Sequence, residues 1–246
     1  MKNHQAPTGR RLSAGMNLEV HSIFDTIQGE GPFAGQPATF IRLAHCNLQC
    51  PACDTEYTEG AETLHIDAIA DQAAHANLVV LTGGEPFRQN IAPLCQELWT
   101  RGVKVQIESN GMLPTQDPDR QTAAAQGLPH MERMLETGQV VLVISPKTHR
   151  LDDVLAPLAS AYKYVITAND VASDGLPIRA LGHPVPQNRT IARPPEGWTG
   201  PIFVQPADSY DEAENAANME QAINSTLMDP ARRRLCLQMH KYARLP

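Results

Sequence analysis

Residues 39–53 read TFIRLAHCNLQCPAC, an alternating apolar segment that runs directly into three cysteines. The alternation over residues 39–43 predicts a β-strand. Cys46, Cys50 and Cys53 follow that strand with the spacing CxxxCxxC. Thiolates so close in sequence can converge on one metal centre without long-range folding. The segment therefore places a candidate metal-binding loop immediately after a strand.

The same order, a short strand followed by polar residues, recurs along the chain. The periodicity predicts strands at 18–24, 78–81, 103–107, 140–144, 162–166 and 202–205, and helices at 66–73 and 90–100. Candidate strand ends carry TGGEP, ESNG, SPK and QP. Polar groups gathered after successive strands are typical of a parallel α/β sheet or barrel, in which chemistry takes place at the carboxyl ends of the strands. Ordinary turn formation explains the polar residues at any one of these strand ends, but it explains less well why they occur at all four.

The length and charge of the chain narrow the class of protein. Its 246 residues suffice for one substantial domain, and 20 Lys+Arg against 27 Asp+Glu give a formal net charge of −7. This charge argues against broad binding of nucleic acid or anionic membranes. Apolar runs such as 140–144 are far shorter than the roughly 20 residues of a membrane span, and no signal peptide is visible. We expect a soluble, cytoplasmic protein.

The sequence predicts one domain with irregular parts. Residues 1–15 form an expected flexible extension, and 16–246 the domain itself, with insertions near 115–139 and 175–200. Seven prolines between 175 and 206 predict a long loop or lid in the second insertion. Residues 235–240 read as a strand that would anchor the chain end inside the fold.

The number and spacing of the cysteines restrict the kind of metal centre. Five cysteines, an odd number, argue against a disulfide framework, and the isolated Cys95 and Cys236 read as buried core residues. A structural zinc site needs four ligands, and His45 is adjacent to a ligand, so it rarely points the same way. A [4Fe–4S] cluster on three cysteines leaves one iron open for an exogenous ligand. The pattern favours the cluster, with a zinc site completed by a distant ligand and chance clustering as alternatives.

The CxxxCxxC motif, followed by TGGEP about thirty residues later, resembles the radical S-adenosylmethionine (SAM) superfamily. The segments 23–31 (IFDTIQGEG), 40–43 (FIRL) and 53–55 (CDT) closely resemble the 7-carboxy-7-deazaguanine synthase family. Shorter likenesses follow at SPK, YKYVI, QP and LQMHK. The resemblance runs from about residue 16 to 246 and is weakest near 115–139 and 175–200.

The resemblance implies a modified, shortened partial (β/α) barrel of the radical SAM type, acting as a homodimer. Such lyases convert 6-carboxy-5,6,7,8-tetrahydropterin to 7-carboxy-7-deazaguanine with release of ammonia, on the route to queuosine. They use a [4Fe–4S] cluster, SAM and Mg²⁺, and an electron donor such as flavodoxin. Reductive cleavage of SAM gives a radical that abstracts hydrogen from the substrate.

Matching positions imply a role for individual residues. The cluster would be held by Cys46, Cys50 and Cys53, and Mg²⁺ by Thr55. SAM would be surrounded by Ala52, Asp54, Gly84, Glu85, Ser109, Ser145, Pro146, Lys147, Gln205, Pro206, Ala207 and Asp208. The substrate would contact Ile27, Gln28, Gly29, Glu30, Arg42, Thr82, His240 and Pro246.

Several of these roles make independent chemical sense. Arg42 offers a bidentate fork to the pterin carboxylate; a strand arginine facing solvent is the alternative. Mg²⁺ prefers oxygen ligands and keeps open positions, so the Thr55 hydroxyl suits it, with a simple turn hydroxyl as the alternative. Gln28 and Glu30 suit the guanidine-like edge of a pterin. For His240, a substrate contact and a partly buried tail residue stay equally open.

Departures from the family pattern affect the cysteine loop. Ala52, preceded by Pro51, stands where the family usually has tryptophan, and His45 stands where glycine is common. Two other classes of function stay open from the residues alone. One is another radical SAM enzyme, such as a glycyl-radical activase, and the other is a non-enzymatic binding module stabilised by a metal.

Overall fold

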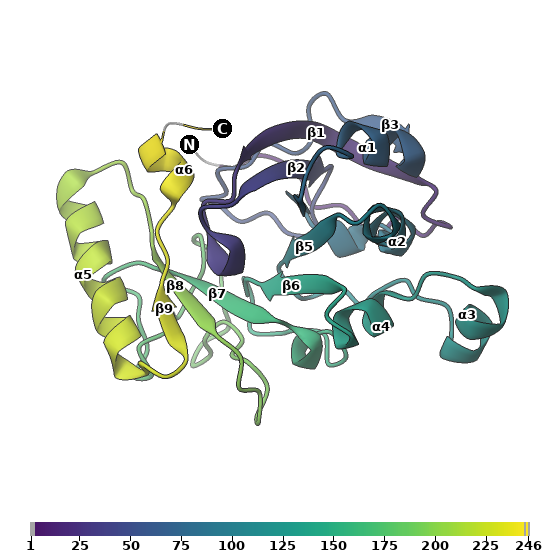
Figure 1. Cartoon of the computed structure of the whole chain (residues 1–246). Helices are drawn as coiled ribbons and strands as arrows, with labels where there is room; N and C mark the ends of the chain where they lie inside the picture. The colour runs from purple at the N-terminus through teal and green to yellow at the C-terminus, as the bar shows by residue number, and fades with distance from the viewer. Residues whose placement is uncertain (1–2, 244, 246) are drawn as a thin grey trace.

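Within the described residues, 3–243 and 245, the computed structural model contains one nine-stranded sheet of order β3-β1-β2-β4-β5-β6-β7-β8-β9 (Figure 1). β1 (Asn17–Ile27) is antiparallel to β2 (Pro37–Leu43) and to β3 (Glu62–His65). From β2 onward in the sheet order, neighbouring strands are parallel. These strands are β4 (Leu78–Gly83), β5 (Lys104–Ser109), β6 (Val140–Ile144), β7 (Ala161–Ile166), β8 (Ile202–Pro206) and β9 (Arg233–Leu235). The predicted α/β class with a parallel sheet is confirmed.

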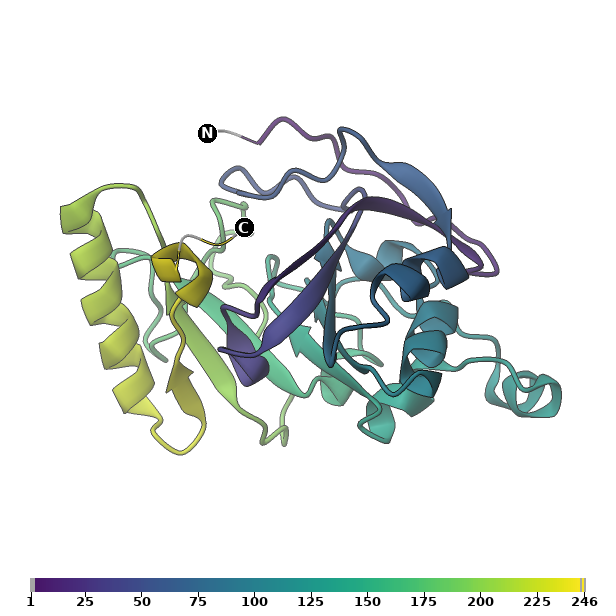
Figure 2. The same ribbon diagram turned by 45° about the horizontal axis from the view of Figure 1, so that its top comes forward.

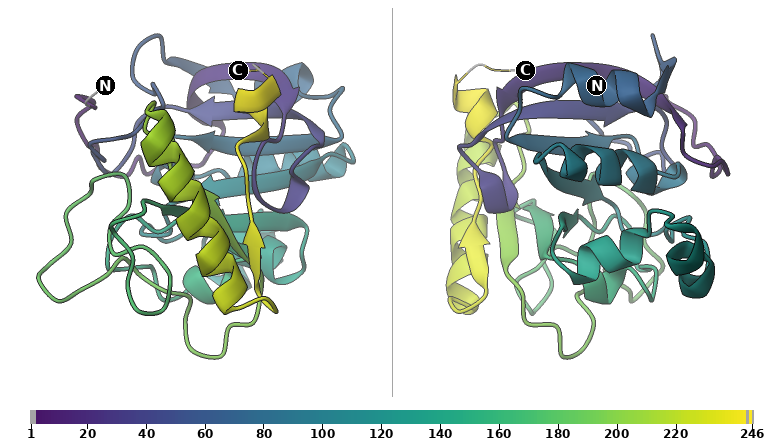
Figure 3. Two further views of the ribbon diagram at one scale, coloured as in Figure 1. Left: turned by 90° about the vertical axis from the view of Figure 1, so that its left-hand side faces the viewer. Right: turned by 45° about the vertical axis from the view of Figure 1, so that its right-hand side comes forward.

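The sheet is an incomplete barrel. β3 and β9 are its edges and do not pair with each other. The sheet twists strongly, so that the chain after β9 returns to the end of β1 (Figure 3). There the Met239 N–H donates to the Gly29 carbonyl at 3.2 Å, and the Gly31 N–H donates to Cys236 Sγ at 3.2 Å. These contacts close one end of the barrel interior, although β9 and β1 do not pair as strands.

Six α-helices and three 3-10 turns occur among the described residues, and the longest helix packs against β8 and β9 (Figure 2). The α-helices are α1 (Ile66–Gln72), α2 (Ala92–Thr100), α3 (Arg120–Gln126), α4 (Met131–Glu136), α5 (Glu212–Met228) and α6 (Met239–Ala243). The 3-10 turns are η1 (Gly31–Phe33), η2 (Pro86–Arg88) and η3 (Ala156–Leu158). None of the described helices is long and apolar enough to cross a membrane.

Alternation of side chains along the strands divides the sheet into two faces. The outward face packs against the helices, with residues such as Ile41, Leu81 and Ile107 in the main core. A smaller apolar cluster, Ala38, Leu78 and Val80 with Phe33 and Phe40, lies on the inner face near the amino ends of the strands. Further along the same face the residues are polar: Arg42, Thr82, Gln106, Glu108, Lys163 and Gln205. The barrel interior is therefore apolar near the amino ends of the strands and polar nearer their carboxyl ends.

The strand predicted at 235–240 is wrong. β9 ends at Leu235, and α6 begins at Met239. β9 pairs with β8 only as far as Val204. Pro206, the last residue of β8, has no N–H with which to continue the ladder. The end of the chain is therefore anchored by a turn of helix.

The irregular segments differ in part from the expectation. Residues 3–15, expected to be flexible, are tied to the body of the protein, because the Thr8 N–H donates to the Cys46 carbonyl at 2.8 Å and the Arg11 N–H donates to the Arg88 carbonyl at 2.7 Å. Polar backbone groups in a loop need such partners. Residues 115–139 hold α3 and α4. Residues 175–200, all described, contain no helix or strand.

Candidate active site

The carboxyl ends of β2, β4 and β5 meet at Glu85. Ser109 Oγ donates to Glu85 Oε1 at 2.8 Å, and the Asn110 N–H donates to Glu85 Oε2 at 2.8 Å. The Glu85 N–H in turn donates to the His45 carbonyl at 2.9 Å. Asn110 Nδ2 reaches Asn47 Oδ1 at 2.8 Å. The ends of β2, β4 and β5 therefore gather at one edge around Glu85, which is fully buried: its carboxylate accepts from the segment that ends β5, and its backbone N–H donates to the segment after β2.

The cysteine loop, residues 44–61, connects β2 to β3 and contains no helix or strand. Burial, and then the charge of Glu85, raise the pKa of Cys46 to about 12. Burial raises the pKa of Cys50 to about 11, where the charge of Lys147 lowers it and the neighbouring Cys53 adds to the rise. The three thiols are thus close enough to interact, and they bind a metal only by releasing protons. All five cysteines of the chain are free.

The donor set fits a three-cysteine cluster. Among the described residues, the sulfur atoms of Cys46, Cys50 and Cys53 do not all lie within 4.8 Å of one another, as the ligands of a single ion would. A [4Fe–4S] cluster takes one thiolate per iron, so it does not require its three thiolates to gather at one point. The residues therefore fit a [4Fe–4S] cluster better than a mononuclear zinc site.

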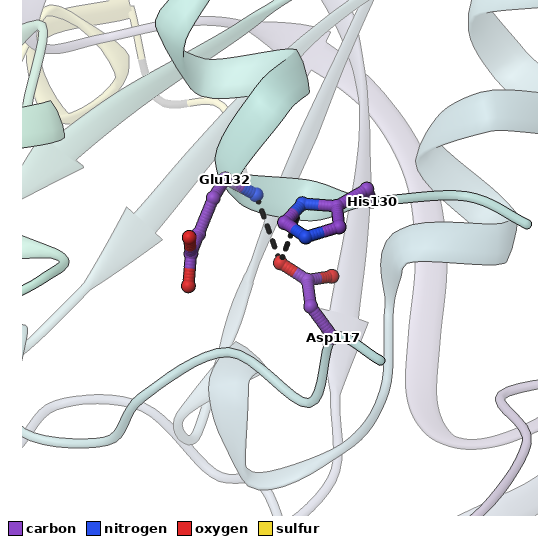
Figure 4. A group of neighbouring side chains, drawn as sticks. All are labelled: Asp117, His130 and Glu132. Atoms are coloured by element: carbon purple, nitrogen blue, oxygen red, sulfur yellow. Dashed lines mark hydrogen bonds and ion pairs between the residues drawn. The ribbon is translucent and has the colours of Figure 1, made fainter. Parts of the chain in front are cut away.

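A different group of ligand-type side chains is gathered that closely: Asp117, His130 and Glu132 (Figure 4). The Asp117 carboxylate accepts from the N–H groups of Met131 at 2.7 Å and Glu132 at 2.9 Å, and lies 3.3 Å from His130 Nδ1. These are the first N–H groups of α4, which have no partner within the helix. The group therefore caps α4, and this role accounts for its geometry.

Two glycines allow β4 to approach the cysteine loop. A Cβ on Gly84 would lie 1.7 Å from the His45 carbonyl oxygen. Gly83 has φ +111°, and its Cβ would lie 2.3 Å from the Leu43 oxygen. His45 itself has φ +65°, in the left-handed region that favours glycine. The resemblance implies glycine at this position, and glycine adopts this backbone conformation without strain.

Residues expected around SAM lie at the carboxyl ends of several strands, and Lys147 is close enough to the cysteine loop for its cysteines to act on it. Lys147 Nζ donates to Ser145 Oγ at 2.6 Å, and burial lowers its pKa while the charges of Cys50 and Cys53 raise it. Ser109 lies on the same edge, bound to Glu85. Pro146 is buried between Ser145 and Lys147, and Ala52 is exposed. Gln205, at the end of β8, is buried, and its Oε1 has no hydrogen-bond partner among the described residues.

The segment after β8 is bound to the end of the chain. The Ala207 N–H donates to the Ile166 carbonyl at 2.8 Å, directly after Pro206. Asp208 Oδ2 lies 2.9 Å from Lys241 Nζ, and this hydrogen bond holds the pKa of Asp208 below its ordinary value. His240 lies in α6, and Pro246 lies outside the described residues.

Gln28 and Glu30, expected to contact substrate, belong to a polar network across the barrel interior. Gln28 Nε2 donates to Glu108 Oε1 at 3.0 Å, and Gln106 Nε2 donates to the same oxygen at 3.1 Å. Lys163 Nζ forms an ion pair with Glu30 and lies 3.7 Å from Glu108 Oε2. Burial opposes the charge on Lys163, but Glu108 and Glu30 raise its pKa above the ordinary value. The network therefore holds a charged lysine between two carboxylates.

The sequence analysis did not single out Gln106, Glu108 and Lys163. The alternation along β5 and β7 contained a signal, because these residues interrupt otherwise apolar strands at inward positions. Cys236, expected in a core, is buried next to this network, where Glu30 and Lys163 act on its charge. Ile27 ends β1 and leads into Gln28 and Gly29.

Arg42 lies half-buried on the inner face, between this network and the cysteine loop. Its guanidinium is 5.0 Å from the Phe24 ring centre. Burial lowers its pKa, whereas Asp54 and Cys53 raise it. Arg42 Nε is buried and has no hydrogen-bond partner in the described part of the chain. This position disfavours the alternative of a solvent-facing strand arginine.

Thr82 is a neighbour of Arg42, and Thr55 follows Asp54, whose charge acts on Arg42. Thr82 is the register neighbour of Arg42 on β4. Thr55 Oγ1 is 3.4 Å from Asp54 Oδ1 on the cysteine loop. The surroundings of Arg42 therefore provide hydroxyl and carboxylate oxygens at the mouth of the interior.

Comparison with known proteins gives a consistent result. No family model matches the chain. The 7-carboxy-7-deazaguanine synthase of Rhodospirillum rubrum is 38% identical over 242 residues, covering 94% of both chains, and that of Rickettsia prowazekii is 38% identical over 243 residues, covering 93% of this chain and 88% of the relative. The same enzyme of Synechocystis is 30% identical, covering 92% and 93%. The crystal structure of QueE from Escherichia coli shares the fold, with a TM-score of 0.60 at 19% identity over 89% of this chain and 94% of that chain.

Proposed function

The chain belongs to the 7-carboxy-7-deazaguanine synthase family, and we propose that its barrel interior converts 6-carboxy-5,6,7,8-tetrahydropterin to 7-carboxy-7-deazaguanine with release of ammonia. The family consists of radical SAM lyases of queuosine biosynthesis, so membership implies a [4Fe–4S] cluster, SAM and a pterin substrate. With SAM, the cluster supplies the radical chemistry. Membership of this family excludes the two alternative functions, those of a glycyl-radical activase and of a binding module.

The position of Arg42 carries the proposal. Its guanidinium is half-buried beside Cys53 and Asp54 and has an unpartnered buried Nε within the described residues. A buried donor without a partner costs free energy, which a bound carboxylate would recover through a charge-assisted pair. The substrate carboxylate would therefore lie at Arg42, near the cysteine loop, with Thr82 beside it.

The pterin body would then extend into the polar interior. Glu108 is an acceptor for the N–H donors of a pterin, and Gln28 offers both a donor and an acceptor. The ion pair between Lys163 and Glu30 keeps this region charged although it is buried. We assign Ile27 and Gly29 to the same substrate surface, and we propose from the family resemblance that His240 and Pro246 contact substrate.

The SAM molecule would lie over the edge where the strand ends meet. Lys147, Ser145 and Pro146 approach it from β6, and Asp54 and Ala52 from the cysteine loop. Gly84 leaves room for close backbone approach. Glu85 is enclosed by protein donors, so we propose that it acts on SAM through the Ser109 hydroxyl. From β8, the residues Gln205, Pro206, Ala207 and Asp208 complete this surface.

We place Mg²⁺ at the Thr55 hydroxyl, together with substrate oxygens, because Mg²⁺ prefers oxygen ligands and retains several exchangeable positions. We also propose a homodimer that is reduced by a flavodoxin-like donor in the cytoplasm. Support comes from the free cysteines, which suit a reducing compartment. Apolar residues exposed beside the edge strand β9, Leu227, Met228, Leu235 and Tyr242, support the dimer.

Binding titrations with the Arg42→Lys variant test the substrate site. Lysine keeps the charge but loses the paired donors, and a charge-assisted hydrogen bond contributes about 1.5–3 kcal/mol. We expect the dissociation constant of the carboxylated pterin to rise about ten- to a hundredfold, with little change for tetrahydropterin without the carboxylate. The control is Arg179→Lys, an exposed pair with Asp170. An equal loss of affinity for both pterins would show that Arg42 does not bind the carboxylate.

A further inference from the structure

Residues 3–15, here called the strap, run beside the cysteine loop (Figure 2). The Asn3 N–H donates to the Pro51 carbonyl at 2.9 Å, and Asn3 Nδ2 donates to the Cys50 carbonyl at 3.1 Å. The Thr8 N–H donates to the Cys46 carbonyl at 2.8 Å. The strap thus donates hydrogen bonds to the backbone carbonyls of Cys46 and Cys50, two of the three cysteines, and of Pro51, which follows Cys50.

The side chain of Gln5 pairs with the cysteine loop as a peptide group would. Its Nε2 donates to the Thr55 carbonyl at 2.8 Å, and its Oε1 accepts from the Tyr57 N–H at 2.8 Å. Tyr57 is buried, and its hydroxyl donates to the Leu48 carbonyl at 3.4 Å. Through Gln5 and Tyr57, the strap is linked to Leu48, inside the cysteine motif, and to Thr55, just after it.

The other end of the strap is fixed to the chain after β4. The Arg11 N–H donates to the Arg88 carbonyl at 2.7 Å, and Asn90 Nδ2 donates to the Ser13 carbonyl at 3.3 Å. Gly15 has φ +80°, and a Cβ there would lie 2.5 Å from the Asn90 carbonyl oxygen. The strap is therefore anchored on the same segment that holds Gly84 and Glu85.

The cysteine loop depends on such outside support. A loop of this length without helix or strand is uncommon and needs partners for its backbone groups. Near Ala52, the partner of the loop is the irregular segment 175–200. The Ala52 N–H donates to the Leu181 carbonyl at 3.0 Å, and Pro51 lies against Gly182. Ala52 is exposed, so no large side chain at this position covers the loop.

We propose that the strap is a positioning element for the cluster, which fixes the cysteine loop at the geometry that metal binding requires and shields it from solvent. This inference rests on the proposed function, because it assumes that Cys46, Cys50 and Cys53 hold the cluster. Asn3 and Gln5 are the residues through which it acts.

Cysteine alkylation in the full-length, metal-free reduced protein tests the proposal. In the double variant Asn3→Leu/Gln5→Leu, we expect Cys50 to react with iodoacetamide about tenfold faster, which corresponds to about 1.4 kcal/mol. Cys95, fully buried in α2, reports global unfolding and should keep its rate. The control is Gln121→Leu, an exposed glutamine on α3. An unchanged Cys50 rate, or equal acceleration of Cys50 and Cys95, would overturn the proposal.

The anaerobically reconstituted protein gives a second readout. The double variant should lose iron on gel filtration and show a shifted midpoint potential and electron paramagnetic resonance spectrum, whereas Gln121→Leu should match the unmodified chain. An identical potential and spectrum in the double variant would contradict a positioning role. If the unmodified chain binds no cluster, the proposed function fails, and the alkylation rates still decide whether the strap orders the thiols.

Discussion

Replacing Gly84 with alanine tests whether the contact between β4 and the cysteine loop is required. The added Cβ would lie 1.7 Å from the carbonyl oxygen of His45 and 2.2 Å from its carbonyl carbon. Carbon–oxygen contacts in proteins are about 3.3 Å or longer. The two backbone segments must therefore separate by about 1.6 Å, and no flexible side chain is available to absorb the movement.

A separation of this size breaks two backbone hydrogen bonds. The Gly84 N–H donates to the Leu43 carbonyl at 3.0 Å, and the Glu85 N–H donates to the His45 carbonyl at 2.9 Å. Each buried group left without a partner costs about 1–3 kcal/mol. We therefore expect Gly84→Ala to lower the free energy of unfolding by about 2–6 kcal/mol, out of a typical total of about 5–15 kcal/mol.

Urea unfolding, monitored by circular dichroism, measures this loss, and iron content after reconstitution measures its effect on the cysteine loop. We expect both to fall in Gly84→Ala. The matched control is Gly9→Ala, where nothing lies within 4 Å of the added Cβ. If Gly84→Ala unfolds within about 0.5 kcal/mol of the unmodified chain, as ordinary surface changes do, the close approach does not exist.

Three further outcomes follow from the site. Alanine at Cys46, Cys50 or Cys53 should abolish iron binding, measured by metal analysis, whereas Cys95→Ala should retain it; normal iron content in Cys50→Ala would refute the ligand set. Lys163→Met leaves Glu30 and Glu108 buried without their cation and should cost about 3–5 kcal/mol in urea unfolding, whereas Lys241→Met on the partly exposed pair with Asp208 should cost less than about 1 kcal/mol; equal costs would refute the buried network. The pKa of Glu56 is lowered from 4.5 to about 2, chiefly by the Thr58 hydroxyl, so the contribution of Glu56 to stability is present above pH 4.5 and is lost as the pH falls towards 2. Nuclear magnetic resonance titration of the Thr58→Val variant should show a higher pKa for Glu56, and an unchanged pKa would refute this cause.

The sequence predicts the parts of the molecule whose signals are local. The inner strands are short apolar runs bounded by turn residues, and the cysteine motif lies within eight positions, 46–53. α5 has no such signal, because it buries only the small residues Asn218, Ala222 and Ser225 and shows no apolar stripe. It packs on β8 and β9 through this narrow face.

The interior network could not be assembled from one sequence. Gln28, Glu108 and Lys163 come from three segments that meet only because of the strand order and the inward register of β5 and β7. Glu108 and Lys163 alone read as polar interruptions of strands, and Gln28 alone reads as a polar residue after the end of β1. The strap was missed for a related reason. Its main contacts are to backbone carbonyls, which leave no pattern in either partner's residue types.

Product formation by the reconstituted enzyme tests the central claim most directly. The chain is loaded anaerobically with iron and sulfide and incubated with SAM, a reductant, Mg²⁺ and 6-carboxy-5,6,7,8-tetrahydropterin, and the products are identified by mass spectrometry. We predict 7-carboxy-7-deazaguanine and ammonia from the unmodified chain, and neither from Cys50→Ala. Cleavage of SAM without any 7-carboxy-7-deazaguanine, in a protein with a full cluster, would contradict the account.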